Sequence, residues 1–225
     1  MNIVWYGQSC FKITTQRQKT KEKVALMIDP FSEKIGLKIP KTEADVFLFT
    51  HNHHDHRNEE FVKKDSFVIS CPGEYELRDI FIQGIHSFHD DVKGSDRGIN
   101  TIYTIETEDV RLCHLGDFGE NELSNKQLKE IGEVDVLMIP VGGVYTIGAK
   151  GATKVISQIE PRIIIPMHYQ LEGLKLGETL EDVESFLKAI GEKGAEKLEK
   201  LSLQKKDLPS SEMKVFPLAP QSKKV

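Results

Sequence analysis

The stretch Val46-Phe47-Leu48-Phe49-Thr50-His51-Asn52-His53-His54-Asp55-His56 joins an apolar run directly to four histidines and an aspartate. The apolar run predicts a buried strand, and the residues after it predict a loop that leaves the end of a sheet. A solvated histidine-rich loop is the alternative. Five potential ligands in six residues, directly after a strand, favour a metal-binding loop, since imidazole and carboxylate groups suit zinc and similar ions.

Further ligand-type residues follow other predicted strands. His89 ends a strand over residues 80–88, and Asp117 lies two residues beyond a strand over 110–115. His168 follows a strand over 163–165 after only Pro166 and Met167. Because functional side chains gather where strands leave a sheet, we expect these three residues to meet the histidine-rich loop.

Outward from this stretch, the first half of the chain reads mainly as sheet. Strands are predicted at 3–6, 10–14, 24–28, 46–50, 67–70 and 80–88, and a hairpin joins 101–106 to 110–115. Residues 71–74 read as a turn. The second half alternates helix and strand, beginning with a capping box at Ser124 and Gln127 and a stop at Gly132.

The later elements complete one domain over residues 1–225, with 221–225 as a loose tail. Helices are predicted at 152–159 and along the apolar stripe from Leu180 to Ile190, and strands at 136–139, 163–165 and 213–216. The order of elements points to two packed sheets with helices outside.

Composition narrows the class of protein. The 225 residues carry a net charge of −5, which disfavours nucleic acid and anionic membranes as partners. No run approaches the roughly 18 apolar residues needed to span a bilayer, and no secretory leader is recognisable, so we expect a cytoplasmic protein. Cys10, Cys71 and Cys113 suggest neither disulfides nor a cysteine zinc site. A homo-oligomer is compatible with this composition.

The ordered motifs resemble those of the metallo-β-lactamase fold superfamily. They are His-x-His-x-Asp-His at 51–56, His89, Gly-Asp at 116–117 and Pro-Met-His at 166–168, with Trp5 to Phe11 and Ile28-Asp29-Pro30 upstream. The similarity is closest to the small single-domain branch that includes L-ascorbate 6-phosphate lactonase-like proteins. It implies an α/β fold, a four-layer αββα sandwich, with the site at one edge.

The resemblance also implies a ligand set. His51, His53 and His89 would bind one metal, Asp55, His56 and His168 the other, and Asp117 would bridge them. Two divalent ions, zinc before manganese or iron, would hold a hydroxide between them that attacks the substrate, with Asp55 and Asp117 as catalytic residues.

Differences between this sequence and known motifs exclude some branches of the superfamily that it resembles. Asp117 stands where a group of β-lactam-cleaving relatives has a cysteine ligand, and His53 stands where the flavodiiron branch has glutamate. Only fifty residues separate Asp117 from His168, too few for the inserted domain of the nucleic-acid-processing branch.

Candidates for substrate binding carry weaker signals. Arg97 in the polar 90–98 loop suits a phosphate or carboxylate, although a surface arginine is an equal reading. Gly143 would let backbone amides approach an anion, and Tyr145 and Tyr169 could donate to an oxyanion, with plain turn and packing roles as alternatives. We interpret His114 as a hydrogen-bonded core residue, His54 as solvent-facing and His86 as lying on a strand face.

The sequence therefore predicts a metal-dependent hydrolase that cleaves a small ester, lactone or phosphodiester. A small-molecule substrate is expected, and Arg97 would suit an anionic one. A phosphodiesterase or short-RNA nuclease is the alternative among enzymes. A non-catalytic metal-binding scaffold is the alternative outside them, although no ligand of the set is missing.

Overall fold

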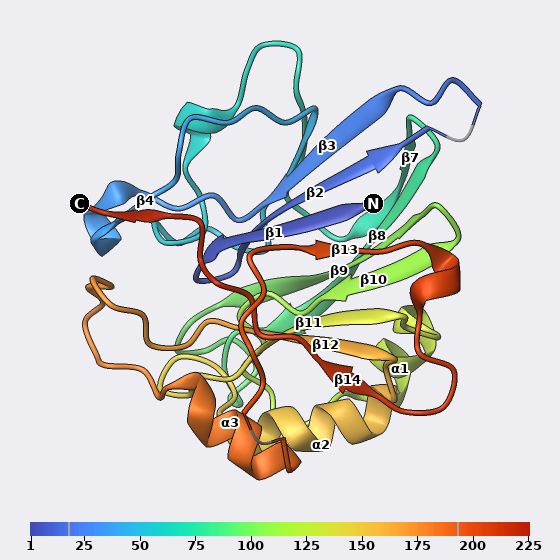
Figure 1. The fold of residues 1–225 in the computed structure, drawn as a ribbon. Helices are drawn as coiled ribbons and strands as arrows, with labels where there is room; N and C mark the ends of the chain where they lie inside the picture. Colours follow the sequence, from blue (N-terminus) through green and yellow to red (C-terminus); the bar gives the residue numbers. More distant parts are fainter. Residues whose placement is uncertain (18, 193) are drawn as a thin grey trace.

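The computed structural model describes residues 1–17, 19–192 and 194–225, and two β-sheets form its centre (Figure 1). The first sheet has the order β13-β1-β2-β3-β5-β6. Its strands are β1 (Asn2–Gly7), β2 (Cys10–Gln16), β3 (Lys23–Ile28), β5 (Val46–Leu48), β6 (Phe67–Ile69) and β13 (Leu201–Ser202).

The second sheet contains seven strands in the order β14-β12-β11-β10-β9-β8-β7. They are β7 (Gly73–Leu77), β8 (Ile80–Phe88), β9 (Ile99–Thr107), β10 (Val110–His114), β11 (Val136–Pro140), β12 (Ile163–Met167) and β14 (Lys214–Val215). The predicted hairpin is confirmed, since Val110 pairs with Thr107 across a turn at Glu108 and Asp109.

Strand direction brings six strand ends to one edge of the sandwich. In the first sheet β1 and β3 are both antiparallel to β2, and β5 is parallel to β3, so the carboxyl ends of β1, β3 and β5 share an edge. In the second sheet β8 and β10 flank β9 in antiparallel pairs, while β11 and β12 continue parallel to β10. The carboxyl ends of β8, β10 and β12 therefore also lie together.

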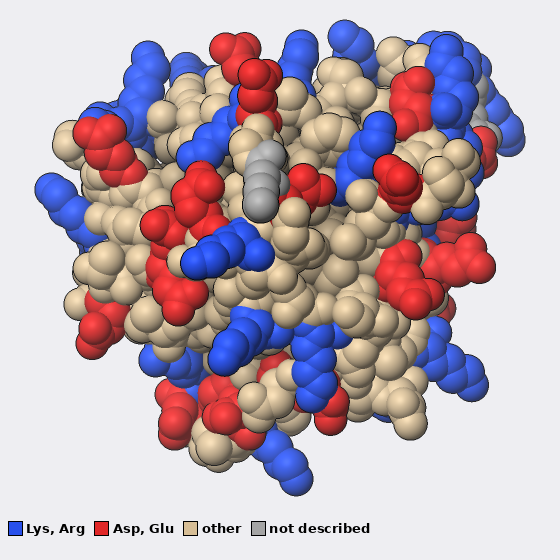
Figure 2. Space-filling model, turned by 60° about the horizontal axis from the view of Figure 1, so that its bottom comes forward, with Lys and Arg blue, Asp and Glu red and all other residues tan. Residues whose placement is uncertain are grey.

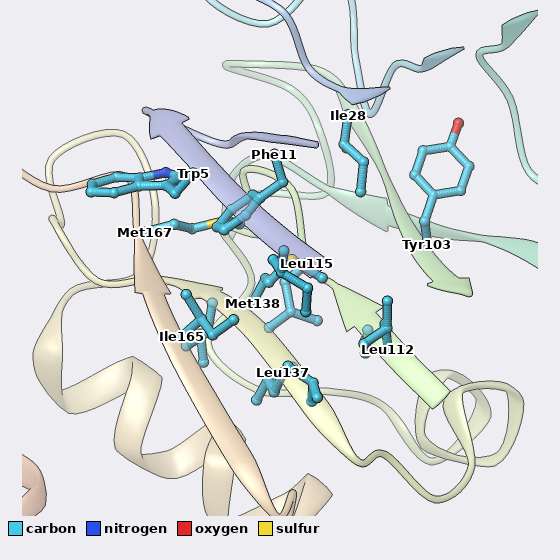
Figure 3. Close-up of a cluster of buried hydrophobic side chains, with 14 of the residues drawn as sticks. Trp5, Phe11, Ile28, Tyr103, Leu112, Leu115, Leu137, Met138, Ile165 and Met167 are labelled. Carbon is cyan, nitrogen blue, oxygen red and sulfur yellow. The ribbon is translucent and has the colours of Figure 1, made fainter. Parts of the chain in front are cut away.

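The hydrophobic core fills the space between the sheets, and Figure 3 shows part of it. Trp5 and Phe11 of the first sheet are fully buried, as are Leu112, Met138 and Ile165 of the second. Apolar burial of this kind contributes roughly 25 cal/mol for each Å² removed from water. The core thus fixes the position of one sheet against the other, and with it the positions of the strand ends.

The three α-helices, α1 (Asn125–Ile131), α2 (Ala149–Ile159) and α3 (Val183–Ile190), lie beside the second sheet (Figure 1). The capping box at Ser124 and Gln127 is present, and α1 ends at Gly132 as predicted. α2 begins at Ala149, three residues before the prediction, and buries Ala152, Val155, Ile156 and Ile159. Leu180 lies before α3, whose N-cap is Asp182.

Short 3-10 helices complete the secondary structure: η1 (Glu33–Ile35), η2 (Glu59–Phe61) and η3 (Lys205–Asp207). Within the described chain, α-helices come only from the second half, so the α/β sandwich predicted from the sequence has its α-helices beside one sheet. None of the helices described here has the length and apolar character needed to cross a membrane.

Two sequence predictions need correction. The turn expected at 71–74 is confined to Cys71 and Pro72, because residues from Gly73 onward belong to β7 and pair with β8. The expected loose tail at 221–225 is ordered, since β15 (Lys223–Lys224) pairs with β4 (Leu37–Lys38) and the Val225 amide donates to the Gly36 carbonyl. Backbone pairing with a distant segment holds this tail in place, which its lysine-rich composition did not indicate.

Candidate metal centre

The seven predicted ligands lie together at the edge where the six strand ends meet. The loop carrying His51, His53, Asp55 and His56 follows β5, while His89 follows β8, Asp117 follows β10 and His168 follows β12. The turn after β1 and Asp29 after β3 reach the same edge. Each of these segments leaves its sheet in the same direction, so the topology alone gathers the site.

The side chains form two clusters. In the first cluster, ligand atoms of His51, His53 and His89 lie within 4.8 Å of one another, and the second cluster of Asp55, His56 and His168 meets the same limit. A further group of Asp29, His51 and His56 is equally compact. His51 and His56 are adjacent, with ring centroids 4.2 Å apart, so the two clusters are neighbours.

Asp117 lies between the clusters. Its Oδ2 atom is 3.2 Å from Nε2 of His89 in the first cluster, and 3.1 Å from Nε2 of both His56 and His168 in the second. The Asp117 carboxylate is almost fully buried. One carboxylate oxygen thus faces both clusters, which is the position of a bridging ligand.

Hydrogen bonds to the other carboxylate oxygen and to the backbone amide hold Asp117 in place. Ser9 Oγ donates to Oδ1 at 3.0 Å, and the Asp117 amide donates to Asn100 Oδ1 at 3.0 Å. Gly116 before it has φ +58, and a Cβ there would lie 2.3 Å from Asn100 Oδ1. Only glycine therefore gives the chain this approach to Asn100.

Asp29 orients two histidines instead of completing a cluster. Its carboxylate accepts the Thr50 amide (2.8 Å) and the Thr50 hydroxyl (2.6 Å), and lies 3.0 Å from Nδ1 of His56. Because the Thr50 hydroxyl donates to Asp29, it is free to accept from His51 Nδ1, 2.9 Å away. Both imidazoles then carry their proton on Nδ1 and present Nε2 to the site, the arrangement that metal-binding histidines require.

The donor set fits divalent cations. His51 Nε2 is buried without a hydrogen-bond partner in the described chain, a costly state for a polar atom unless an ion takes its lone pair. Burial, followed by the neighbouring His56, holds the pKa of His51 well below its usual range, and burial and His89 lower the pKa of His53. Neutral imidazole is the form that binds metal.

The carboxylates are ionised. Burial alone would raise the pKa of Asp117, but His168 and His56 hold it well below its usual range. Burial also opposes ionisation of Asp55, yet contact with His56 lowers the pKa of that carboxyl. Burial alone would lower the pKa of His56, but Asp117 and Asp55 hold it well above its usual range, so a cation at this imidazole would replace a proton. The centre therefore combines imidazole nitrogens with anionic oxygen donors, which suits zinc, manganese or iron.

A cavity of about 270 Å³ opens above the centre. It is lined by His53, His54, Asp55, His89, Arg97, Asp117, Tyr145, Leu176 and Gly177. The Arg97 guanidinium lies over the Tyr145 ring, 4.7 Å from its centroid. These two predicted substrate-binding residues are therefore placed at the mouth of the metal centre.

The loop that carries Arg97 is organised by Asp90. The Asp90 carboxylate accepts the backbone amides of Val92, Gly94, Asp96 and Arg97, at 2.6–3.1 Å. Four amide donors on one buried carboxylate fix the course of the loop, so Arg97 is presented from an ordered segment.

Two other predicted substrate-binding residues are directed elsewhere. The Gly143 amide donates to the Ile147 carbonyl, so it is used within the turn and is not aimed at a ligand. Tyr169 is buried against Trp5, and its hydroxyl approaches the Leu218 carbonyl. For Gly143 and Tyr169 the structure therefore favours the turn and packing roles, because local backbone pairing and core packing engage both groups.

The three remaining histidines follow their predicted readings. His114 is buried, with Nε2 2.9 Å from the Ser9 carbonyl and Nδ1 accepting the Gly116 amide. Burial lowers its pKa, so it is a neutral structural histidine beside the centre. His54 and His86 are exposed.

Sequence reasoning missed the residues that support the centre. Gln8, Ser9, Asp29 and Asn100 contact ligands, but none was predicted to do so. Asp29 and the Gly7-Gln8-Ser9 turn both follow strands, which is the signal that identified the ligands; Asn100 lies inside β9 and gives no such signal.

Comparison with known proteins agrees with this geometry. The family model described as the beta-lactamase superfamily domain matches residues 2–168. A UPF0173 protein from Pyrococcus abyssi is 31% identical over 191 residues, covering 77% of this chain and 85% of its own. A UPF0173 metal-dependent hydrolase from Archaeoglobus fulgidus is 27% identical, covering 86% and 92%.

A solved structure extends the agreement to the fold. The candidate Zn-dependent hydrolase of the metallo-β-lactamase superfamily from Thermotoga maritima superposes with a TM-score of 0.75 and 34% identity, covering 97% of this chain and 99% of its own. The chain therefore belongs to the β-lactamase superfamily, as one of its metal-dependent hydrolases.

Proposed function

We propose that this hydrolase uses two divalent metal ions, preferably zinc, to cleave a small anionic ester, lactone or phosphodiester. The observation that carries the proposal is the position of Asp117 Oδ2, which lies 3.1–3.2 Å from histidine nitrogens of both clusters. A carboxylate placed in this way suits two cations rather than one. When bound, the ions would lower the pKa of a coordinated water toward about 7, so that hydroxide is available at neutral pH.

Asp117 and Asp55 have separate roles in the proposed reaction. Asp117 fixes the position of the two clusters relative to each other, because Ser9 holds its carboxylate and Asn100 holds its backbone amide. Asp55 lines the cavity with its side chain 15% exposed, so its ionised carboxylate can accept a hydrogen bond from the attacking water and orient it. No protein nucleophile is needed for this chemistry.

Arg97 and Tyr145 support an anionic substrate. Stacking on the Tyr145 ring leaves the guanidinium edge free to pair with a carboxylate or phosphate, which arginine binds through two parallel hydrogen bonds. The described chain gives Arg97 no carboxylate partner within ion-pair distance, so its charge is available to a ligand at the cavity mouth. The Asp90-centred loop holds Arg97 there.

A small substrate fits better than a polynucleotide. The cavity of about 270 Å³ accommodates a compact molecule, since it lies just below the usual range of about 300–1,000 Å³ for ligand sites. On the face seen in Figure 2, basic and acidic side chains are interspersed and form no basic track. Cleavage of short RNA is accordingly the less favoured activity.

The test compares wild type with Asp117→Ala, both purified metal-free and reconstituted with zinc or manganese. Aryl phosphodiesters, lactones, carboxylic esters and thioesters, each with and without an added carboxylate or phosphate, form the substrate panel. We expect hydrolysis by the wild type and a loss of activity in the variant. Matched thermal unfolding of the two metal-free proteins shows that the variant folds.

Two outcomes would overturn the proposal. Full activity with a single bound metal would contradict the two-metal centre. A wild type that binds two ions yet hydrolyses no member of the panel would favour a metal-binding role without catalysis.

A further inference from the structure

Gln8 reaches the second cluster from the turn between β1 and β2. Its side chain is fully buried, and Nε2 lies 3.4 Å from Asp55 Oδ2 and 3.3 Å from His168 Nε2. These are two of the three members of the second cluster. Gln8 is thus in contact with the ligand set, although no resemblance or comparison gave it a role.

The backbone of Gln8 is held in an uncommon conformation. Its φ is +49, in the left-handed region that residues other than glycine rarely adopt. Its carbonyl accepts the Trp5 indole N–H at 2.9 Å and the His168 amide at 3.1 Å. The fold therefore imposes this conformation from both sheets and fixes where the Gln8 side chain begins.

The carboxamide oxygen of Gln8 is unsatisfied as it stands. Its Oε1 atom is buried without a partner in the described chain, while its NH₂ group donates to Asp55 Oδ2 and faces His168 Nε2. That nitrogen can accept a proton or bind a cation, but not both at once. A divalent ion held by Asp55, His56 and His168 would therefore repel the NH₂ group and attract the oxygen. The two ends of a carboxamide are nearly equal in size, so they can exchange places without repacking.

We propose that Gln8 is a further ligand of the second cluster and offers its carboxamide oxygen to the cation held by Asp55, His56 and His168. This inference rests on the proposed two-metal function. It makes the second cluster richer in oxygen than the first, which offers three imidazoles. Carbonyl and carboxylate oxygens suit manganese, whereas imidazole suits zinc, so the two clusters differ in metal preference.

The test measures metal binding, not catalysis, on the full-length chain. Metal-free wild type, Gln8→Leu and Gln8→Glu are titrated with Mn²⁺ and with Zn²⁺ against a chromogenic chelator, and bound metal is counted by mass spectrometry. Gln158→Leu is the control, because both ends of the Gln158 carboxamide bond the Leu123 backbone, away from the centre. Thermal unfolding of each metal-free protein checks folding.

We expect Gln8→Leu to weaken binding of the second ion by about 10- to 100-fold and to leave the first within about threefold. Gln8→Glu keeps an oxygen in place and should hold the second ion at least as tightly as wild type. If Gln8 served only as an N–H donor to Asp55, Gln8→Glu would remove the donor, add a repelling charge, and weaken binding as Gln8→Leu does. That result, or an unchanged second affinity in Gln8→Leu, would overturn the inference.

The outcomes separate this inference from the proposed function. A wild type that hydrolyses the panel while Gln8→Leu keeps both affinities refutes the role of Gln8 alone. A wild type that binds only one ion refutes the two-metal function itself.

Discussion

Asp29 and His56 form a buried pair in which Oδ2 of the carboxylate lies 3.0 Å from Nδ1 of the imidazole. The same oxygen accepts the Thr50 hydroxyl, through which Asp29 also acts on His51. One carboxylate after β3 thus sets the tautomer of a histidine in each cluster.

Asp29→Asn should weaken metal binding without removing a ligand. The amide group of asparagine would face the His56 N–H and favour the opposite tautomer, which places a proton on the Nε2 atom aimed at the cluster. We expect a drop of about 10- to 100-fold in affinity for the second ion, measured by calorimetric titration. Asp45→Asn is the control, because Asp45 accepts the Ala25 amide at the opposite end of β3 and β5. Equal affinities in Asp29→Asn and wild type would contradict the orienting role.

Arg97→Gln should reduce activity selectively toward anionic substrates. Loss of a charge-assisted hydrogen-bond pair costs about 1.5–3 kcal/mol, so kcat/KM should fall by roughly 10- to 100-fold for substrates with a carboxylate or phosphate. Neutral analogues should change by less than about threefold. Arg57→Gln provides the matched control, since Arg57 stacks on Phe49 outside the cavity. An equal loss for neutral and anionic substrates would count against anion recognition.

Tyr103→Phe should destabilise the sandwich. Tyr103 is buried in β9, and its hydroxyl donates to the Phe49 carbonyl at 2.9 Å, which links the second sheet to the segment before His51. Removing the hydroxyl leaves a buried carbonyl without its donor, at a cost of about 1–3 kcal/mol in the free energy of unfolding. Urea unfolding of the metal-free proteins measures it. A difference below about 0.5 kcal/mol would show that the carbonyl finds another partner.

Glu108→Gln should affect stability in a pH-dependent way. Burial opposes ionisation of Glu108, but its bonds to the N-terminal amine, Thr15 and the Gln16 amide hold its pKa below the ordinary value of 4.5. A depressed pKa means that the carboxylate stabilises the folded state above pH 4.5, and that this contribution is lost as the pH falls through the folded-state pKa. The difference between wild type and variant should therefore be present at pH 7 and shrink below pH 4.5. Urea unfolding of both metal-free proteins across this range checks it, and a difference that grows on acidification would contradict the assignment.

The ligands of the centre were predictable because their position in the chain reports their position in space. His51, His89, Asp117 and His168 each follow an apolar strand, and strands that point the same way deliver such residues to one edge. The apolar strands themselves were recognisable from their β-branched and aromatic residues. Strand order was not needed to find these residues, only the fact that a ligand-type residue lies within three positions of the end of each strand.

The supporting residues could not be predicted in the same way. Asn100 lies within β9 and acts through contacts with Asp117 and Leu115 that depend on how β9 and β10 pair. Tyr169 directly follows His168 and Gly143 follows β11, but the directions of a side chain and of an amide, which composition does not encode, turn them away from the centre. β15 escaped prediction for a related reason, since only its partner β4 makes it a strand.

The contact between Gln8 and His168 joins residues 160 positions apart in the chain. A chain synthesised from its N-terminus exposes the histidine-rich loop well before His168 exists. Under the proposed function, an ion bound early would be held by residues up to His89 and would lack His168. Full coordination has to wait until β12 pairs beside β11 and delivers the last imidazole. In the proposed two-metal centre, a second tightly held ion would therefore mark a molecule in which both sheets have assembled.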